Sequence, residues 1–126
     1  MRRLLDTSVL IDHLRGVERA VELLTTFAAA GDELWSVTPV RTEVLAGMRR
    51  GEEKKTMLLL NALAWQVVTE EVADRAGVLA RRFLRSHPGV DTVDYIIAAA
   101  ALELGAQLVT LNLKHFPMFS DLRRPY

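Results

Sequence analysis

Short apolar runs alternate along the chain with longer segments in which apolar side chains recur every three or four positions. The first arrangement is typical of buried strands, and the second of helices with one apolar face. Val9, Leu10 and Leu14, for example, share a helical face that ends at Gly16. The pattern predicts strands at residues 2–6, 34–37, 65–68 and 107–110, with Leu122 a candidate for a last edge strand. It predicts helices at residues 9–16, 17–30, 38–50, 52–63, 69–86 and 91–105, and a short turn or helix at residues 112–116.

Several of these helices carry start signals. Thr38 followed by Pro39 is typical of a hydroxyl cap with proline at the first helical position. Thr69 precedes two acidic residues that suit the positive end of a helix dipole. Because strands alternate with helices throughout, we expect an α/β fold with a parallel sheet and helices on both faces. We expect one domain over residues 1–126, without linker or repeat.

Composition narrows the classes of function. The 126 residues are 50% hydrophobic and 25% charged, as in ordinary globular proteins. The absence of cysteine excludes disulfide scaffolds, cysteine-based zinc sites and thiol catalysis. Sixteen basic residues offset sixteen acidic ones, so the chain is not a strongly basic nucleic-acid binder, although a local basic patch stays open. Asp6 and Asp12 interrupt the apolar start, and no apolar run is long enough to span a membrane, so we expect a cytoplasmic protein.

Polar side chains follow each of the predicted strands. Ligands of open α/β sheets bind beyond the carboxyl ends of the strands, so these side chains mark the candidate site. Two further acids would reach the same rim from the helices that begin there. The set comprises Asp6, Thr38, Thr69, Thr110 and Asn112 at the strand ends, with Glu43 and Asp94 on the helices.

Three carboxylates in this set, Asp6, Glu43 and Asp94, have the chemistry of a metal site. Asp94 directly precedes an almost wholly apolar helix, which would hold it at the rim of the sheet. Carboxylates that converge raise one another's pKa, and Mg²⁺ relieves this repulsion with a preference for oxygen ligands. Such a site supports phosphodiester hydrolysis without cysteine, histidine or lysine. Taken singly, each carboxylate is more often only a helix cap, and spacing alone leaves both interpretations open.

Four segments carry a family resemblance: LDTSVLI at residues 5–11, TEV at 42–44, DYIIAAAA at 94–101 and LVTLN at 108–112. In this order they resemble the successive signatures of the PIN-domain nucleases, and the small size resembles the VapC-type toxins of prokaryotic toxin–antitoxin pairs. The resemblance implies a PIN-like three-layer α/β/α sandwich with a mainly parallel central sheet and the first strand in its interior. It also implies an endoribonuclease that depends on Mg²⁺, or on Mn²⁺ as a substitute, forms a homodimer and is neutralised by a cognate antitoxin.

The resemblance assigns roles to individual residues. Asp6 and Asp94 would be the principal metal-site carboxylates, and Glu43 would act through water or orient the attacking water. Asn112 matches a position that holds Asp or Asn in the family. Ser8 matches a hydroxyl that commonly hydrogen-bonds into this cluster.

One position departs from the family pattern, because His115 stands where many relatives carry an acid. A fourth carboxylate would then come from elsewhere. Asp91 is a candidate, since it lies one helical turn before Asp94, but it is equally a plain helix cap. We expect all three histidines, His13, His87 and His115, to be surface or loop residues. Arg41, one helical turn from the cleft, is a candidate for direct contact with phosphate.

Rival interpretations fail at required residues or remain to be tested. A haloacid-dehalogenase phosphatase needs a second acid where Ser8 stands, and a receiver domain needs an aspartate where Thr69 stands. A PIN-like binding module without catalysis remains the alternative. The apolar surplus at residues 57–60 is assigned to the core, with a dimer or antitoxin groove as the other option. We expect asparagine at Asp6 or Asp94 to abolish cleavage and to leave the fold intact or more stable.

Overall fold

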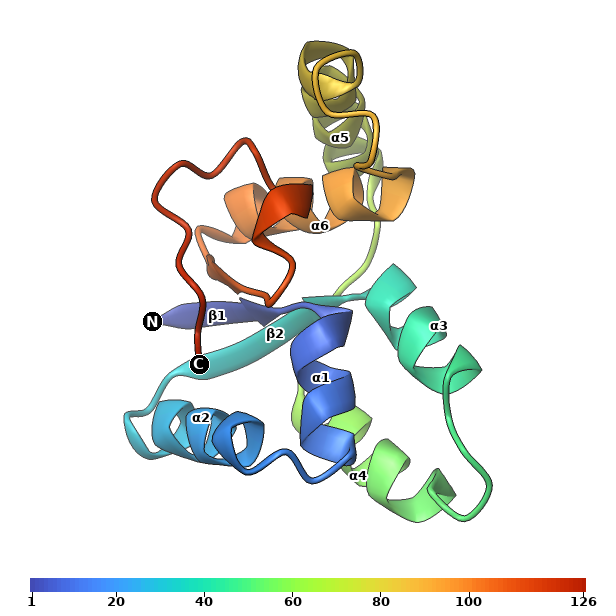
Figure 1. The fold of residues 1–126 in the computed structure, drawn as a ribbon, viewed down its shortest axis with the longest axis vertical. Helices are drawn as coiled ribbons and strands as arrows, with labels where there is room; N and C mark the ends of the chain where they lie inside the picture. Colours follow the sequence, from blue (N-terminus) through green and yellow to red (C-terminus); the bar gives the residue numbers. More distant parts are fainter.

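A computed structural model describes all 126 residues (Figure 1). At its centre is one sheet of four strands, β1 (Arg2–Leu5), β2 (Glu33–Val37), β3 (Ala64–Gln66) and β4 (Gln107–Val109). The strands lie in the order β3-β2-β1-β4, and each neighbouring pair is parallel. β1 is therefore interior, and Leu4 pairs with Trp35 on one side and Leu108 on the other. The predicted parallel sheet is confirmed.

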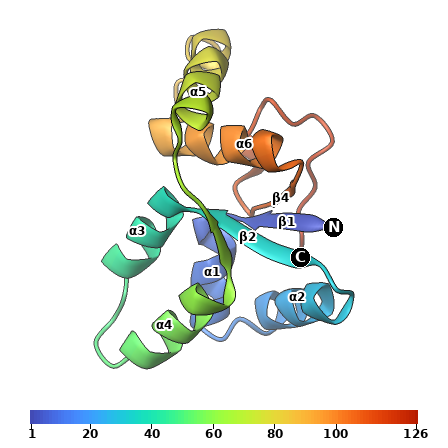
Figure 2. The same ribbon diagram turned by 180° about the vertical axis from the view of Figure 1, so that it is seen from behind.

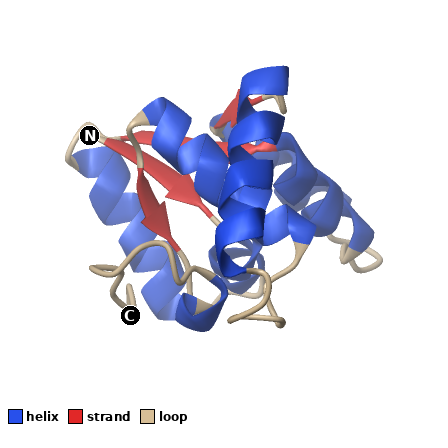
Figure 3. Ribbon diagram, turned by 90° about the horizontal axis from the view of Figure 1, so that it is seen from above, coloured by secondary structure: helices blue, strands red, loops and turns tan.

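Helices cover both faces of this sheet. In Figures 1 and 2, α1, α2 and α4 lie on one side of the strands, and α5 and α6 lie on the other. Figure 3 shows the strands from above, in red, among the helices. The expected three-layer α/β/α sandwich is confirmed, and none of its helices has the length and apolar character needed to cross a membrane. The helices are α1 (Thr7–Leu14), α2 (Glu18–Ala29), α3 (Thr38–Ala46), α4 (Glu53–Ala62), α5 (Glu70–Phe83) and α6 (Thr92–Leu104), followed by the 3₁₀ turn η1 (Leu113–His115).

The apolar helix α6 packs between the sheet and α5. It buries Tyr95, Ile97 and the four consecutive alanines at residues 98–101, whose small side chains allow close approach. Gly105 ends the helix with a φ of 60°, a left-handed conformation that glycine adopts without steric cost. Asp91 caps its beginning, so the first turn, which carries Asp94, is held firmly.

The start of α3 differs from the prediction. Val37, the last residue of β2, is the N-cap, and no side chain caps the helix. Thr38 is already helical and Pro39 follows within the first turn. Proline is tolerated there because its missing N–H has no partner in a first turn, so the Thr-Pro signal located the helix but not its cap.

The end of α3 also differs, because the helix stops at Ala46 with Gly47 as its cap rather than near Arg50. The guanidinium of Arg15 donates to the Gly47 carbonyl at 3.3 Å. Glu52 then accepts the backbone N–H of Arg49 at 2.7 Å. The first of these bonds joins residues far apart in the sequence, so local propensity does not contain it, whereas the second joins residues three positions apart.

The C-terminal end forms no strand at Leu122. The backbone N–H of Leu122 donates to the carbonyl of Phe119 at 3.3 Å, which makes a turn. The last residue, Tyr126, reaches α1, where its hydroxyl donates to Asp12 Oδ2 at 2.8 Å. α5 likewise ends at Phe83, three residues before the predicted boundary at residue 86.

The apolar run at residues 57–60 divides between core and surface. Leu59 and Leu60 are buried, as expected for core residues. Leu58 is 65% exposed and Met57 is 37% exposed. Part of the apolar surplus on α4 therefore faces solvent.

Candidate active site

Asp6 follows β1 directly and is the N-cap of α1. It is 4% exposed, and three donors surround its carboxylate. Oδ1 accepts the backbone N–H of Thr7 at 2.7 Å. Oδ2 accepts the hydroxyls of Ser8 at 3.2 Å and Thr110 at 2.6 Å. These bonds offset much of the cost of burying the charge.

The two hydroxyls that donate to Asp6, those of Ser8 and Thr110, are themselves held by backbone N–H groups that follow β4. Ser8 Oγ accepts the N–H of Leu111 at 3.2 Å, and Thr110 Oγ1 accepts the N–H of Asn112 at 3.0 Å. Each hydroxyl must therefore direct its own proton at Asp6. The sequence had placed Thr110 at the rim without giving it a role. The contact requires β4 to lie beside β1, and the apolar pattern does not encode that order.

Asp94 is bound into the start of α6 by a reciprocal pair of hydrogen bonds. Its backbone N–H donates to Asp91 Oδ1 at 3.0 Å, and the N–H of Asp91 donates to Asp94 Oδ2 at 3.1 Å. Burial, together with the negative charges of Asp91 and Asp6, raises the pKa of Asp94 to about 6. The N–H of Asp91 and the imidazole of His115 act in the opposite direction. The charge of Asp6 thus disfavours the ionised form of Asp94, a repulsion that was expected from the sequence.

The sequence left two roles open for Asp91, a fourth metal-site carboxylate or a plain helix cap. In the structure Asp91 is the N-cap of α6. Its carboxylate accepts the Asp94 N–H and is otherwise exposed. A part in metal binding stays a prediction.

Glu43 reaches the same region from α3. Its side chain is exposed, and its Oε1 accepts the hydroxyl of Thr7 at 2.7 Å. Thr7 was not among the predicted site residues. The signal was present in its position directly after Asp6, at the first residue of a helix that starts at the rim.

His115 contacts the site rather than only the solvent. Its Nδ1 lies 3.3 Å from Asp94 Oδ2, and its side chain is 44% exposed. The expectation of a surface residue therefore holds for its exposure but missed this contact. The imidazole of His115 therefore faces the carboxylate of Asp94 and helps to hold its pKa down.

The side chains of the remaining predicted residues, Asn112 and Arg41, form no hydrogen bond or ion pair with the carboxylates. The side chain of Asn112 is exposed and makes no hydrogen bond within the protein. The guanidinium of Arg41 stacks on Trp65, 5.2 Å from the ring centre. Contact between Arg41 and phosphate stays a prediction.

The donor set fits a hard divalent cation such as Mg²⁺. No three Asp, Glu or His side chains close around a single point as a ready-made cage. Mg²⁺ does not need one, since it commonly takes one or two carboxylates and completes its shell with water or phosphate. Asp94 Oδ1 and Glu43 Oε2 accept no hydrogen bond from the protein and remain available. The raised pKa of Asp94 marks negative charge that a cation would offset.

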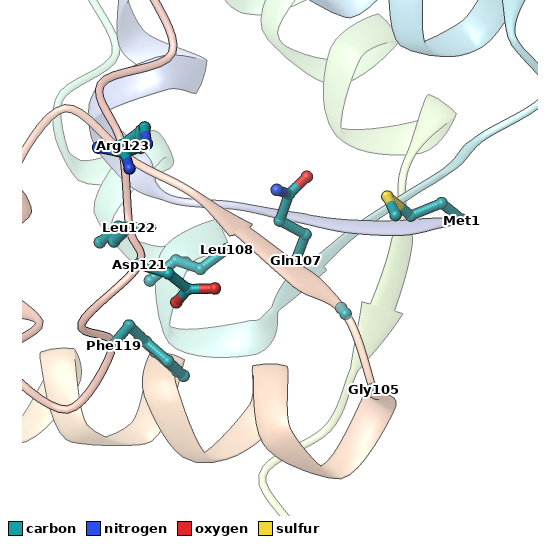
Figure 4. Close-up of a pocket in the computed structure, with 9 residues that line it drawn as sticks. Met1, Gly105, Gln107, Leu108, Phe119, Asp121, Leu122 and Arg123 are labelled. Carbon is teal, nitrogen blue, oxygen red and sulfur yellow. The ribbon is translucent and has the colours of Figure 1, made fainter.

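A pocket of about 630 Å³ lies at the other end of β1 and β4 (Figure 4). Met1, Gln107 and Arg123 are among its lining residues. None of the predicted site residues lines it, so this pocket is not the candidate active site.

Comparison with known protein families shows to which family this chain belongs. The PIN domain family matches residues 3–120. The chain belongs to the PIN domain family. This PIN domain is 45% identical over 124 residues to "Ribonuclease VapC19" of Mycobacterium tuberculosis, covering 98% of this chain and 99% of that protein. It is 42% identical over 123 residues to "Ribonuclease VapC10" of the same organism, covering 98% and 92% of the two chains.

Solved structures share the fold. A toxin–antitoxin complex from Klebsiella pneumoniae superposes with a TM-score of 0.83 at 24% identity, covering 98% of both chains. VapBC2 from Rickettsia felis, bound to a promoter DNA fragment, gives a TM-score of 0.81 at 20% identity, covering 97% of the PIN domain described here and 96% of that chain. At these identities the likeness concerns the fold alone.

Proposed function

We propose that this PIN domain is a Mg²⁺-dependent endoribonuclease of the VapC type, for which Mn²⁺ can substitute. It hydrolyses RNA phosphodiester bonds in the cytoplasm and is held inactive by a cognate antitoxin. One observation carries the proposal: the charge of Asp6, at the end of β1, acts on the buried Asp94 in the first turn of α6, in a chain 45% identical to "Ribonuclease VapC19".

The roles follow from the contacts. Asp6 and Asp94 would hold the cation, which when bound supplies positive charge to the scissile phosphate and to a water molecule. Ser8, Thr110 and the N–H of Thr7 fix the orientation of Asp6.

Two other groups complete the arrangement. The cap at Asp91 fixes the first turn from which Asp94 projects. Glu43, with one oxygen free, orients the attacking water by accepting its proton in a hydrogen bond.

Cleavage of a panel of structured RNAs by the purified protein tests this function. We expect products with Mg²⁺ or Mn²⁺ and none with EDTA or with Asp94→Asn. Cleavage by Asp94→Asn at the wild-type rate would refute the assignment. Absence of both cleavage and metal binding in the wild-type protein would favour the non-catalytic binding module.

The antitoxin is proposed to act at the rim that carries Asp6 and Asp94. An acid-rich rim on a chain of zero net charge favours a basic side chain from the partner, directed toward Asp6 and Asp94. The exposed Met57 and Leu58 on α4 offer apolar area for the rest of the contact. A structure of the complex with no basic side chain of the partner near Asp6 and Asp94 would rule out this mode of inhibition.

A homodimer is proposed from the exposed face of α5. This helix packs on α6 along one side, while Val78 is 68% exposed, and Leu84, the cap directly after the helix, is 55% exposed. Light scattering should give twice the monomer mass, and Val78→Glu should return the monomer. A monomeric wild-type protein would contradict this assembly.

A further inference from the structure

The hydroxyl of Thr7 is the one protein group that hydrogen-bonds to the carboxylate of Glu43. The distance from Thr7 Oγ1 to Glu43 Oε1 is 2.7 Å, within the range of charge-assisted bonds between a hydroxyl and a carboxylate. Glu43 is otherwise exposed, forms no ion pair and has a long, rotatable side chain. Without Thr7, this carboxylate would sample many rotamers in solvent.

Thr7 is itself held rigidly. It is the first residue of α1, and its backbone N–H donates to Asp6 Oδ1 at 2.7 Å. One residue therefore contacts two carboxylates, Asp6 through its amide and Glu43 through its hydroxyl. Because α1 and α3 are otherwise separate elements packed side by side, this bridge relates the end of β1 to the side chain from α3.

We propose that Thr7 is a positioning residue that holds Glu43 in register with Asp6 for the attack on the phosphate. The inference rests on the proposed ribonuclease function. A carboxylate that orients water gains from a fixed geometry, and loss of one such restraint slows the chemical step more than it weakens substrate binding.

The variants follow from the shape of threonine. Thr7→Val keeps the size and the backbone N–H but removes the hydroxyl, and Thr7→Ser restores a hydroxyl. Thr25→Val is the matched control, since the Thr25 hydroxyl donates at 2.8 Å to the Val21 carbonyl on α2, outside the site. We expect Thr7→Val to lower kcat about tenfold, the size of one lost charge-assisted hydrogen bond, with KM nearly unchanged. Thr7→Ser should recover most of the loss, and Thr25→Val should leave kcat at the wild-type value.

A double-mutant cycle with Glu43→Gln locates the effect. In the Glu43→Gln background, Thr7→Val should cost little further activity, because the bond it removes is already impaired. The same four proteins, unfolded in urea with EDTA present, should show coupling between the two positions in the free energy of unfolding. That second cycle reports on the bond without any reaction.

The outcomes separate the two proposals. Wild-type kcat in Thr7→Val, full additivity with Glu43→Gln, or absence of coupling in urea would each overturn the role of Thr7. Absence of cleavage by the wild-type protein would instead overturn the ribonuclease function, and with it the catalytic purpose of a bridge that the urea cycle detects.

Discussion

Asp6 and Asp94 are both buried carboxylates, but the surroundings of Asp6 stabilise its negative charge, whereas those of Asp94 disfavour it. Asp6 receives three donors, whereas Asp94 lies beside two negative charges. The two residues should therefore respond differently to the same substitution, although the sequence suggested the same response for both.

Asp94→Asn should stabilise the protein without metal at neutral pH. The folded-state pKa of about 6 lies above the ordinary value of 3.8, so ionised Asp94 costs stability, and the cost develops as the pH rises from about 4 to above 6. The gain should be about 1–2 kcal/mol at pH 7.5, after allowance for solvent screening. Urea unfolding with EDTA at pH 7.5 and 4.5 measures it, with the gain shrinking at the lower pH. Asp74→Asn on the exposed face of α5 is the control, and an equal gain there would contradict the explanation.

Asp6→Asn should instead destabilise the protein, which revises the expectation from the sequence. In one orientation the new amide NH₂ faces the hydroxyls of Ser8 and Thr110, and in the other it faces the N–H of Thr7. Either way donors oppose donors, at a cost of about 1–3 kcal/mol. Urea unfolding at pH 7.5 gives the value, and unchanged stability would show that the hydroxyls reorient freely.

At the scale of elements, α1 and the loop between α3 and α4 are joined through Glu52. Arg15 donates to its carboxylate at 2.9 Å, and Lys55 lies 3.6 Å away. The N–H of Arg49, the charge of Arg15 and the charge of Lys55 lower the pKa of Glu52, against the effect of burial.

Glu52→Gln should lower the melting temperature at pH 7. A depressed folded-state pKa means that the carboxylate adds stability above its ordinary pKa, and that this contribution disappears as the pH falls below about 4. Melting curves at pH 7 and pH 3.5 should show the difference from wild type narrowing in acid. Glu22→Gln on α2, which has no ion pair, provides the baseline. A difference that is constant with pH would contradict the assignment.

The elements that the sequence predicted well are those whose information is local. The alternation of apolar runs located the four strands, and the acid–apolar boundary at Asp94 located the start of α6. The end of α3 at Ala46 was missed, although Gly47 directly after it is a local stop signal, and the prediction ran on to Gly51 instead.

The residues of the candidate site likewise divide into those with a local signal in the sequence and those without one. Asp6, Glu43 and Asp94 stand out as acids next to apolar segments; Thr7 links Asp6 to Glu43, and the charge of Asp6 acts on Asp94. The hydroxyls of Thr7 and Thr110 matter only through partners on other elements, so no local pattern distinguishes them from ordinary threonines.

At the scale of the whole molecule, a bound cation should increase the stability of the folded protein. Mg²⁺ or Mn²⁺ should raise the melting temperature of the wild-type protein, because binding at a hundredfold excess over Kd adds about 2.7 kcal/mol. Scanning calorimetry against NaCl of equal ionic strength measures the shift. The shift should be lost in Asp94→Asn and kept in Asp74→Asn. A wild-type protein indifferent to both ions would argue against a metal centre.

The order of strands in the sheet has a consequence for synthesis. Asp6 is synthesised long before Thr110, which donates one of its three hydrogen bonds, and before Leu111, whose N–H holds the Ser8 hydroxyl that donates another. A nascent chain therefore contains Asp6 long before it contains the groups after β4 that orient the Asp6 carboxylate. The orientation of the Asp6 carboxylate is therefore completed only when β4 has entered the sheet.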